Sequence, residues 1–480
     1  MTLSLMATGL PDPSAKAPVL DDGAATADEF AMLQRCWTLW HSKLERNALR
    51  TRYYRGHVSA VTLPGTVPPE YRTLDTVVGW PARAVESLAA RSVLNGFSTA
   101  SGDGELDRIL AENDFGLLYE EAKVSELVHS CSFWTVSAGD PSKGDPSVVV
   151  NAYSALNATA VWDSRRKRVA YGMAIVDADE DGNPSEVNLY THDTVVTFSH
   201  PAGRRVWTVR RERHSMGRPL IEPMVHRPSI ERPMGTSRIT RAVMALTDSA
   251  MRTELEAEVS SALYSAPKRY LVGVDPADFE GGWDGYIDAI MTVARGVDDS
   301  NPQVGQFAPT SPAPFSERMR DLAARFAGET GVPMGSLGVV HDNPASADAI
   351  AAAREDLVVE AEALNRTNGR ALRNVALMAL ATARGTPVSG LGDELTALRP
   401  LWGPADKPSR AALADAGLKY VQAFPALAET SVGMELAGLS EDQIERARAE
   451  TVNDQALGFA AALLAPSGAG AETGGQPQEE

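Results

Sequence analysis

The chain has 480 residues and a formal net charge of -18, from 63 acidic and 45 basic side chains. Its hydrophobic content of 44% and charged content of 22% are ordinary for a folded protein, and its length predicts several modules with a substantial core. The acidic excess opposes adhesive binding to phosphate backbones or anionic lipid unless a local basic patch overrides it, although it is compatible with DNA that slides past.

Cysteine content and the apolar runs indicate where the chain is made. Cys36 and Cys131 are too few for a disulfide framework and predict reduced, buried thiols. The first residues lack the cationic start and the apolar segment of a signal peptide, and no apolar run is long enough to span a membrane. We therefore expect a soluble chain made in a cytosol, with no membrane partner.

The N-terminal part is predicted to be helical. Residues 1–27 are rich in Pro, Gly and Ala and are expected to be mobile. A helix should start at residue 28 and end within residues 50–57, with a second over 76–97 and a third over 115–131. Apolar side chains at spacings of three and four mark the core face of the first helix: Phe30, Leu33, Trp37, Trp40 and Leu44.

The sequence pattern changes from helical to strand-like between Phe133 and Arg210. Seven short segments rich in β-branched and aromatic residues are separated by turn clusters, which predicts an antiparallel meander. Within it, Asp177, Asp179, Asp181 and Gly182 match the first half of a calcium-binding EF-hand loop. The twelfth position is Asn188 instead of a bidentate Glu, and strands flank the loop, so a hairpin turn is the better interpretation and no metal site is predicted.

Residues 203–240 reverse the overall charge, with nine arginines and three glutamates. Such a stretch could bind nucleic acid, or it could form a salt-bridged subunit interface or a solvated strand face. The aromatic residues are not interleaved as single-strand binders require. A salt-bridged subunit interface or a solvated strand face is therefore favoured over nucleic-acid binding.

The centre of the chain has the order helix, small insert, returning helix, loop and very long helix. Ser237 and Pro267 are predicted to bound the first helix, which at 28 residues would be roughly 42 Å long. The returning helix covers residues 315–333, and the insert between them is predicted as strand, helix (277–294) and strand. The last helix could run from Asn343-Pro344 to Gly385, and a bend would be tolerated at Gly369.

The first central helix carries four acidic side chains beside its apolar stripe. Asp248 and Arg252 form a favourable i,i+4 pair, whereas Glu254 and Glu258 form a repulsive one. Together with Glu256 they admit two interpretations: a solvated helix face, or a wall of repeated helices that is acidic toward a shared channel.

Motifs for catalysis are absent. The sequence has no phosphate-binding G-x-x-x-x-G-K-[ST] loop, no H-E-x-x-H or C-x-x-C metal motif and no G-x-S-x-G nucleophile elbow. We find no internal repeat. No cofactor and no enzymatic activity are predicted.

Three blocks, residues 63–97, 235–273 and 331–362, resemble the portal proteins of tailed bacteriophages, in the branch of long-tailed phages that infect actinobacteria. The resemblance runs from about Asp28 to Arg384. It implies an α+β, mainly helical portal-type fold that assembles as a dodecameric ring at one capsid vertex. Double-stranded DNA would pass through the ring during packaging and ejection.

The resemblance also implies a division into modules. In chain order these are a wing of helices and β meander (28–236), a first stem helix (237–267), a clip (268–314), a second stem helix (315–334), a tunnel loop (335–346), a wing spine helix with its connection (347–408), a crown (409–465) and a disordered tail (466–480).

By position, the residues lining the DNA channel would be Glu254, Glu258, Val340, His341, Asp342 and Asn343. Residues of the clip that dock partners would be Asp284, Asp288, Asp298 and Asp299. The implied partners are the terminase large subunit, the head-to-tail adaptor, and the major capsid and scaffolding proteins. The protein would be made in the host bacterial cytoplasm and end in the virion.

Two other classes of function compete with this expectation. One is a cytosolic calcium- or nucleotide-dependent enzyme whose motif is not recognised, which would need a convergent cluster of ionisable groups. The other is a DNA-binding capsid protein that uses the arginine-rich segment. It predicts tight, salt-sensitive binding of free duplex, whereas a portal predicts weak binding and a ring.

Overall fold

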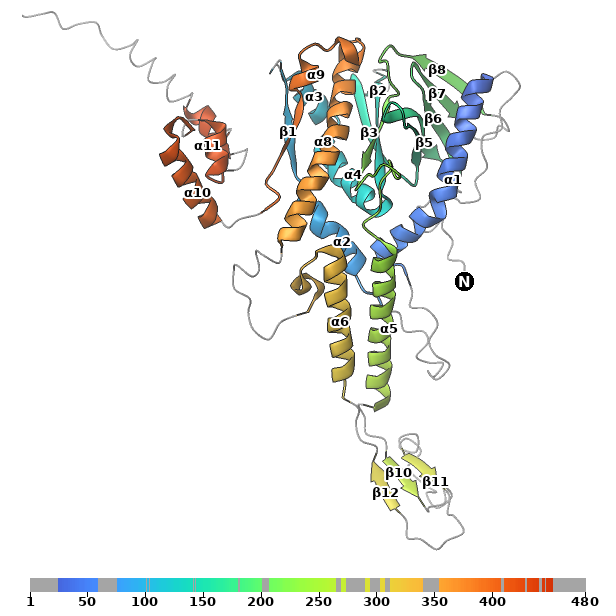
Figure 1. Cartoon of the computed structure of the whole chain (residues 1–480). Helices are drawn as coiled ribbons and strands as arrows, with labels where there is room; N and C mark the ends of the chain where they lie inside the picture. The colour runs from blue at the N-terminus through green and yellow to red at the C-terminus, as the bar shows by residue number, and fades with distance from the viewer. Residues whose placement is uncertain are drawn as a thin grey trace, which may run out of the picture. The chain divides into compact units, whose positions relative to one another are not determined.

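The computed structural model describes residues 25–58, 76–264, 269–272, 290–293, 303–306, 311–339, 354–406, 410–427, 430–439 and 443–451, apart from short gaps at 101, 103, 141, 143, 180–181, 201–206 and 445. The chain divides into two compact units, residues 1–405 and 406–480. Figure 1 gives the element labels used below.

The long helices of the first unit are α1 (Ala27–Arg55), α2 (Trp80–Ala89), α3 (Glu105–Glu112), α4 (Phe115–His129), α5 (Arg241–Tyr264), α6 (Ala313–Thr330) and α8 (Glu355–Ala383). Shorter helical segments are η6 (Met334–Leu337), η7 (Val388–Gly390) and α9 (Glu394–Ala397). The second unit contains α10 (Arg410–Ala423), η8 (Pro425–Leu427) and α11 (Ser431–Leu436).

Two antiparallel sheets form the body of the first unit, where one meander was predicted. The larger has the order β4 (Ala158–Asp163), β5 (Arg168–Ala178), β6 (Pro184–Tyr190), β7 (Thr194–Ser199) and β8 (Thr208–Arg213). The smaller places β2 (Cys131–Ala138) between β3 (Val148–Ser154) and β9 (Ile221–Val225). The predicted antiparallel meander is confirmed for β4 to β8, but β2 and β3 lie in a separate sheet, where β9, which the sequence analysis missed, pairs with β2.

The helices cover the sheets with the apolar faces that their periodicity predicts. Trp37, Trp40 and Leu44 of α1 pack in one cluster with Met173 and Phe198 of the larger sheet, so the predicted core face of α1 is confirmed. The C-terminal half of α8 packs on the smaller sheet and is buried almost completely. Figure 1 shows α8 running along β2 and β3.

Several predicted boundaries change because distant segments compete for the same residues. The helix expected over 76–97 spans only Trp80–Ala89, and residues Leu94–Ser98 form β1, which pairs with β13 (Arg399–Trp402). A Cβ at Gly369 would lie 3.2 Å from Cγ of Pro400. This glycine therefore allows α8 to approach β13 closely, a role that the sequence analysis did not foresee.

The insert between α5 and α6 is described only at three strands. β10 (Arg269–Val272) pairs in parallel with β11 (Ile290–Val293) and antiparallel with β12 (Gln303–Gln306). The predicted helix over 277–294 is wrong at its last residues, since 290–293 are a strand; residues 273–289 lie outside the described part of the chain.

Candidate functional site

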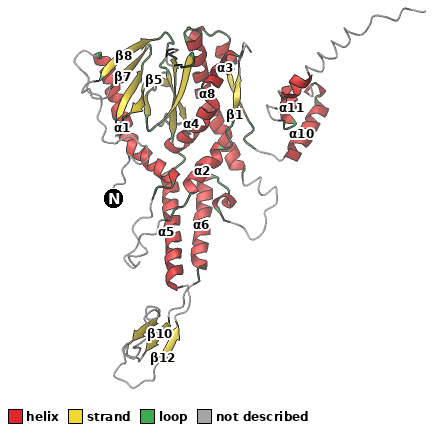
Figure 2. Ribbon diagram, turned by 180° about the vertical axis from the view of Figure 1, so that it is seen from behind, coloured by secondary structure: helices red, strands yellow, loops and turns green. Residues whose placement is uncertain are grey.

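Helices α5 and α6 lie side by side as an antiparallel pair (Figures 1 and 2). Val243 and Ala250 of α5 share a buried cluster with Leu322, Ala323 and Phe326 of α6. Polar contacts set the register: Thr240 Oγ1 donates to Glu329 Oε1 and Arg318 Nε donates to Thr253 Oγ1, both at 3.1 Å.

The start of α5 differs from the prediction. The helix begins at Arg241, and the residue that caps it is Thr240, whose Oγ1 accepts from Val243 N at 3.2 Å. Ser237, the predicted cap, instead uses its hydroxyl to bond Val128 O and to accept from Ile239 N. The serine therefore attaches the chain to the end of α4 just before the helix begins.

Three exposed glutamates follow one another on α5. Glu254 and Glu258 are one helical turn apart and lie on the same face, whereas Glu256 points to another side of the helix. Within the described residues none of the three forms an ion pair. Glu254 also borders a hollow of ≈ 480 Å³ between α5 and α6, with Arg320 and Met319 on its other wall. The predicted pairing of Asp248 with Arg252 is not found: Asp248 accepts from the Tyr53 hydroxyl at 2.7 Å, and Arg252 Nη2 donates to Ser249 Oγ at 3.1 Å.

The other predicted site residues fall outside the part of the chain that the structure describes. This applies to the loop residues Val340, His341, Asp342 and Asn343 and to the four clip residues Asp284, Asp288, Asp298 and Asp299. The described residues nearest to the loop are Val339 and Gly338, which follows η6 as its C-cap with a positive φ of 85°.

A buried arginine holds the root of α5 in the body of the unit. Arg238 donates through Nη2 to Thr330 O at the end of α6 at 2.6 Å and through Nε to Ala84 O of α2, and its guanidinium pairs with Glu360 of α8. Arg238 is 4% exposed, so its charge is neutralised by protein groups and hardly by water. One side chain thus ties together α2, α6, α8 and the segment that leads into α5.

Glu360 is the counterion of more than one cation. Arg227 Nη2 lies 2.8 Å and His226 Nε2 3.7 Å from Glu360 Oε1. Burial by itself would raise the pKa of Glu360, but the His226 contact and the charges of Arg238 and Arg227 outweigh it and lower the pKa to about 2. The sequence analysis missed this cluster, because no local pattern connects residues 226–238 with residue 360.

Most of the arginine-rich segment is neutralised within the chain. Five of the seven arginines of this segment that the structure describes form ion pairs: Arg210 with Glu212, Arg211 with Glu29, Arg218 with Glu222, and Arg227 and Arg238 with Glu360. These ion pairs are internal to one chain, so the predicted subunit interface stays a prediction.

Neither metal chemistry nor a membrane span is found among the described residues. The acidic turn at 177–188 is a β5–β6 hairpin in which Asp179 Oδ1 accepts from Asn183 N at 2.7 Å. No cluster of His, Cys, Asp or Glu in the described ranges could hold a metal ion. None of the described helices is both apolar enough and long enough to cross a bilayer.

Comparison with known proteins decides the family. A family model described as phage portal protein, SPP1 Gp6-like, matches residues 33–423, which is most of the chain. The chain belongs to this portal family. It is 27% identical over 385 residues to the portal protein of Mycobacterium phage D29, covering 77% of each chain, and 28% identical over 389 residues to that of phage L5, covering 78% of each. The resemblance inferred from the three sequence blocks is confirmed, including its actinobacterial branch.

Solved neck structures are also similar to this portal. The neck of a native GTA particle, computed with C12 symmetry, matches 81% of this chain and 99% of its own at 16% identity and a TM-score of 0.39. The neck of an empty GTA particle, computed with C6 symmetry, matches 75% and 90% at 13% identity and a TM-score of 0.37. The chain has the α+β portal-type fold that its family implies.

Proposed function

We propose that twelve copies of this chain form a ring at one vertex of a phage capsid and that double-stranded DNA passes through the ring during packaging and ejection. Membership of the portal family, through the match over residues 33–423, is the observation that carries this proposal. The antiparallel pair of α5 and α6 is the stem in this arrangement, and the strands β10 to β12 belong to the clip.

The exposed carboxylates of α5 give the proposed channel its chemistry. Glu254 and Glu258 lie on one face, so a ring of stems places two acidic layers along the pore. Fixed negative charge repels the phosphates and removes the sticky contacts that a basic lining would make with each passing nucleotide. In this proposal residues 340–343 complete the lining.

The partners of the ring follow from its place in the particle. The clip docks the terminase large subunit during packaging and the head-to-tail adaptor afterwards, and Asp284, Asp288, Asp298 and Asp299 are proposed to take part in this docking. The wing contacts the major capsid and scaffolding proteins, and the second unit forms the crown. The chain acts as a conduit and not as an enzyme, because the motor that consumes ATP is a separate protein.

Negative-stain imaging of the purified full-length chain tests the ring. We expect annular particles, and the mass of the assembly, measured by mass photometry, should be that of twelve chains. A solution of monomers at micromolar concentration, with no annular particles, contradicts the proposal. Tight and salt-sensitive binding of free duplex by those monomers would favour the DNA-binding capsid protein instead.

A further inference from the structure

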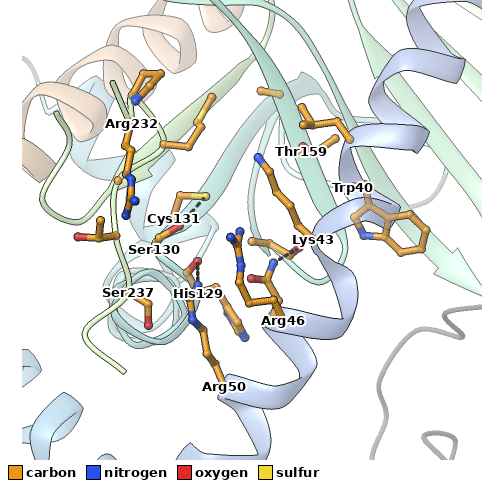
Figure 3. A pocket seen from close by; sticks show the side chains of 18 of the residues that line it. Trp40, Lys43, Arg46, Arg50, His129, Ser130, Cys131, Thr159, Arg232 and Ser237 are labelled. Atoms are coloured by element: carbon orange, nitrogen blue, oxygen red, sulfur yellow. Dashed lines mark hydrogen bonds between the residues drawn. The ribbon is translucent and has the colours of Figure 1, made fainter. Parts of the chain in front are cut away.

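A basic cavity of ≈ 810 Å³ lies beside the root of α5, away from the stem surface (Figure 3). Its walls come from α1, the junction of α4 with β2, strand β4, and residues 231–241, which lead into α5. Nothing in the proposed passage of DNA uses this cavity.

Five of its lining side chains are cationic. Lys43, Arg46 and Arg50 follow one another at spacings of three and four along α1, and Arg232 and Arg241 come from the segment that leads into α5. In Figure 3 the side chains of Lys43 and Arg46 leave α1 on the side that faces Arg232. Glu231 is the single carboxylate among the lining residues. A net-acidic chain has thus gathered positive charge around one cavity, where Lys43 and Arg50 are half-buried and Arg46, Arg232 and Arg241 are exposed.

These cations lack carboxylate partners within the described chain. Arg50 Nη1 donates to His129 O at 3.4 Å, but its Nε is buried without a hydrogen-bond partner there. Burial lowers the pKa of Lys43, and burial together with the charge of Arg46 lowers the pKa of Arg50 to about 10. Crowded, partly desolvated cations are costly unless an anion neutralises them.

We propose that this cavity binds a small multivalent phosphate anion, of the size of pyrophosphate or a nucleoside phosphate. Guanidinium groups match phosphate oxygens in bidentate geometry, and a lysine adds a point charge. The volume is in the range that holds metabolite-sized ligands. A double helix does not fit into a recess of this size, so free phosphates are favoured over the DNA backbone.

A ligand at this position would connect two segments of the chain. An anion held between Lys43 and Arg46 on one side and Arg232 on the other joins α1 to the segment that ends in α5. Binding to the folded state alone also stabilises that state by mass action. This inference does not depend on ring assembly, since every lining residue belongs to one chain.

Isothermal titration calorimetry of the full-length chain with pyrophosphate, at ionic strength held constant with chloride, tests the proposal. We expect saturable binding, and we expect Arg46→Gln or Arg232→Gln each to weaken it by about tenfold, the effect of losing one charge-assisted hydrogen bond. Arg35→Gln is the matched control, because Arg35 is exposed on α1 but does not line the cavity. Circular dichroism checks that each variant is folded.

Three outcomes would overturn the proposal. One is the absence of saturable binding by the unchanged chain, and another is equal binding by Arg35→Gln, Arg46→Gln and Arg232→Gln. The third uses a labelled short duplex: if it binds in a manner that depends on Arg46 and pyrophosphate does not compete, the basic residues serve DNA. If pyrophosphate displaces the duplex at constant ionic strength and the duplex binds only weakly, the proposed phosphate site is supported.

Discussion

Arg238 and Glu126 are both buried ionisable groups, but only Arg238 has an oppositely charged partner. Arg238 is neutralised by Glu360 and by backbone carbonyls from two helices. Glu126 has a single described partner, Asn368, whose Nδ2 donates at 2.8 Å, and its other oxygen is buried without one. Burial therefore raises the pKa of Glu126 to about 8, although the Asn368 hydrogen bond opposes the shift.

The neutralisation of Arg238 predicts an unequal effect of removing two partners of the same carboxylate. Arg238→Met should lower the free energy of unfolding by about 3 kcal/mol or more, because it leaves Glu360 buried with weaker compensation. Arg227→Met should cost less than about 1 kcal/mol, since the Arg227 side chain is 60% exposed. Urea unfolding followed by tryptophan fluorescence measures both, and equal losses would contradict the role assigned to Arg238.

The raised pKa of Glu126 predicts a pH dependence with a definite sign. Below about pH 4.5 both states hold the proton; above it the unfolded chain releases the proton while the folded chain keeps it up to about pH 8. The contribution of Glu126 to stability is therefore lost as pH rises through this window, at about 1.4 kcal/mol per pH unit. Glu126→Gln should remove this component, so its stability relative to the unchanged chain should increase between pH 5 and pH 8 in urea titrations. A pH-independent difference would contradict it.

At the scale of elements, the two ends of α5 differ: its N-terminal end is fixed to the body of the unit, and its later turns carry exposed glutamates. Its root is fixed by Arg238, Thr240 and the Tyr53–Asp248 hydrogen bond, whereas its exposed glutamates leave one face free. Helical periodicity alone indicated which side chains are exposed, so Glu254 and Glu258 were placed on the surface of α5 from sequence. Their role as channel lining remains a prediction.

Charge reversal on α5 tests that role. Glu254→Lys with Glu258→Lys should leave the number of rings unchanged and lower packaging of nuclease-protected DNA at least about tenfold, because two basic layers would hold the phosphates. Glu256→Lys is the control for position, since it reverses one charge on another side of the same helix, which is half the charge change of the double variant. Packaging is measured with particles assembled in vitro from each variant. If the double variant formed fewer rings, but the rings that did form packaged DNA normally, this face of α5 would be turned away from the pore.

At the scale of the whole molecule, the two units differ in how they are stabilised. The three large hydrophobic clusters contain residues between Leu33 and Ala405 only, so the first unit contains its own core. The boundary between the units follows β13, whose pairing with β1 connects residues that are three hundred positions apart in sequence.

This division predicts the outcome of two truncations. Deletion of residues 406–480 should leave the urea midpoint of the first unit nearly unchanged, because no residue of its clusters is removed. Deletion of residues 399–480 should destabilise it clearly, because β1 then loses β13 and its ladder of hydrogen bonds. Circular dichroism and urea unfolding compare the two, and similar losses in both would contradict the assignment of the boundary.

The sequence by itself determined the local elements and the family. Helices α1, α4, α5 and α6 and most strands follow from periods of 3.6 and 2, which depend only on neighbouring residues. The tertiary structure alone decided the pairing of β1 with β13, the addition of β9 to β2, the ion pairs around Glu360 and the basic cavity beside α1. Each of these joins segments that are far apart in the chain, and which of them meet depends on how all the apolar faces are buried together.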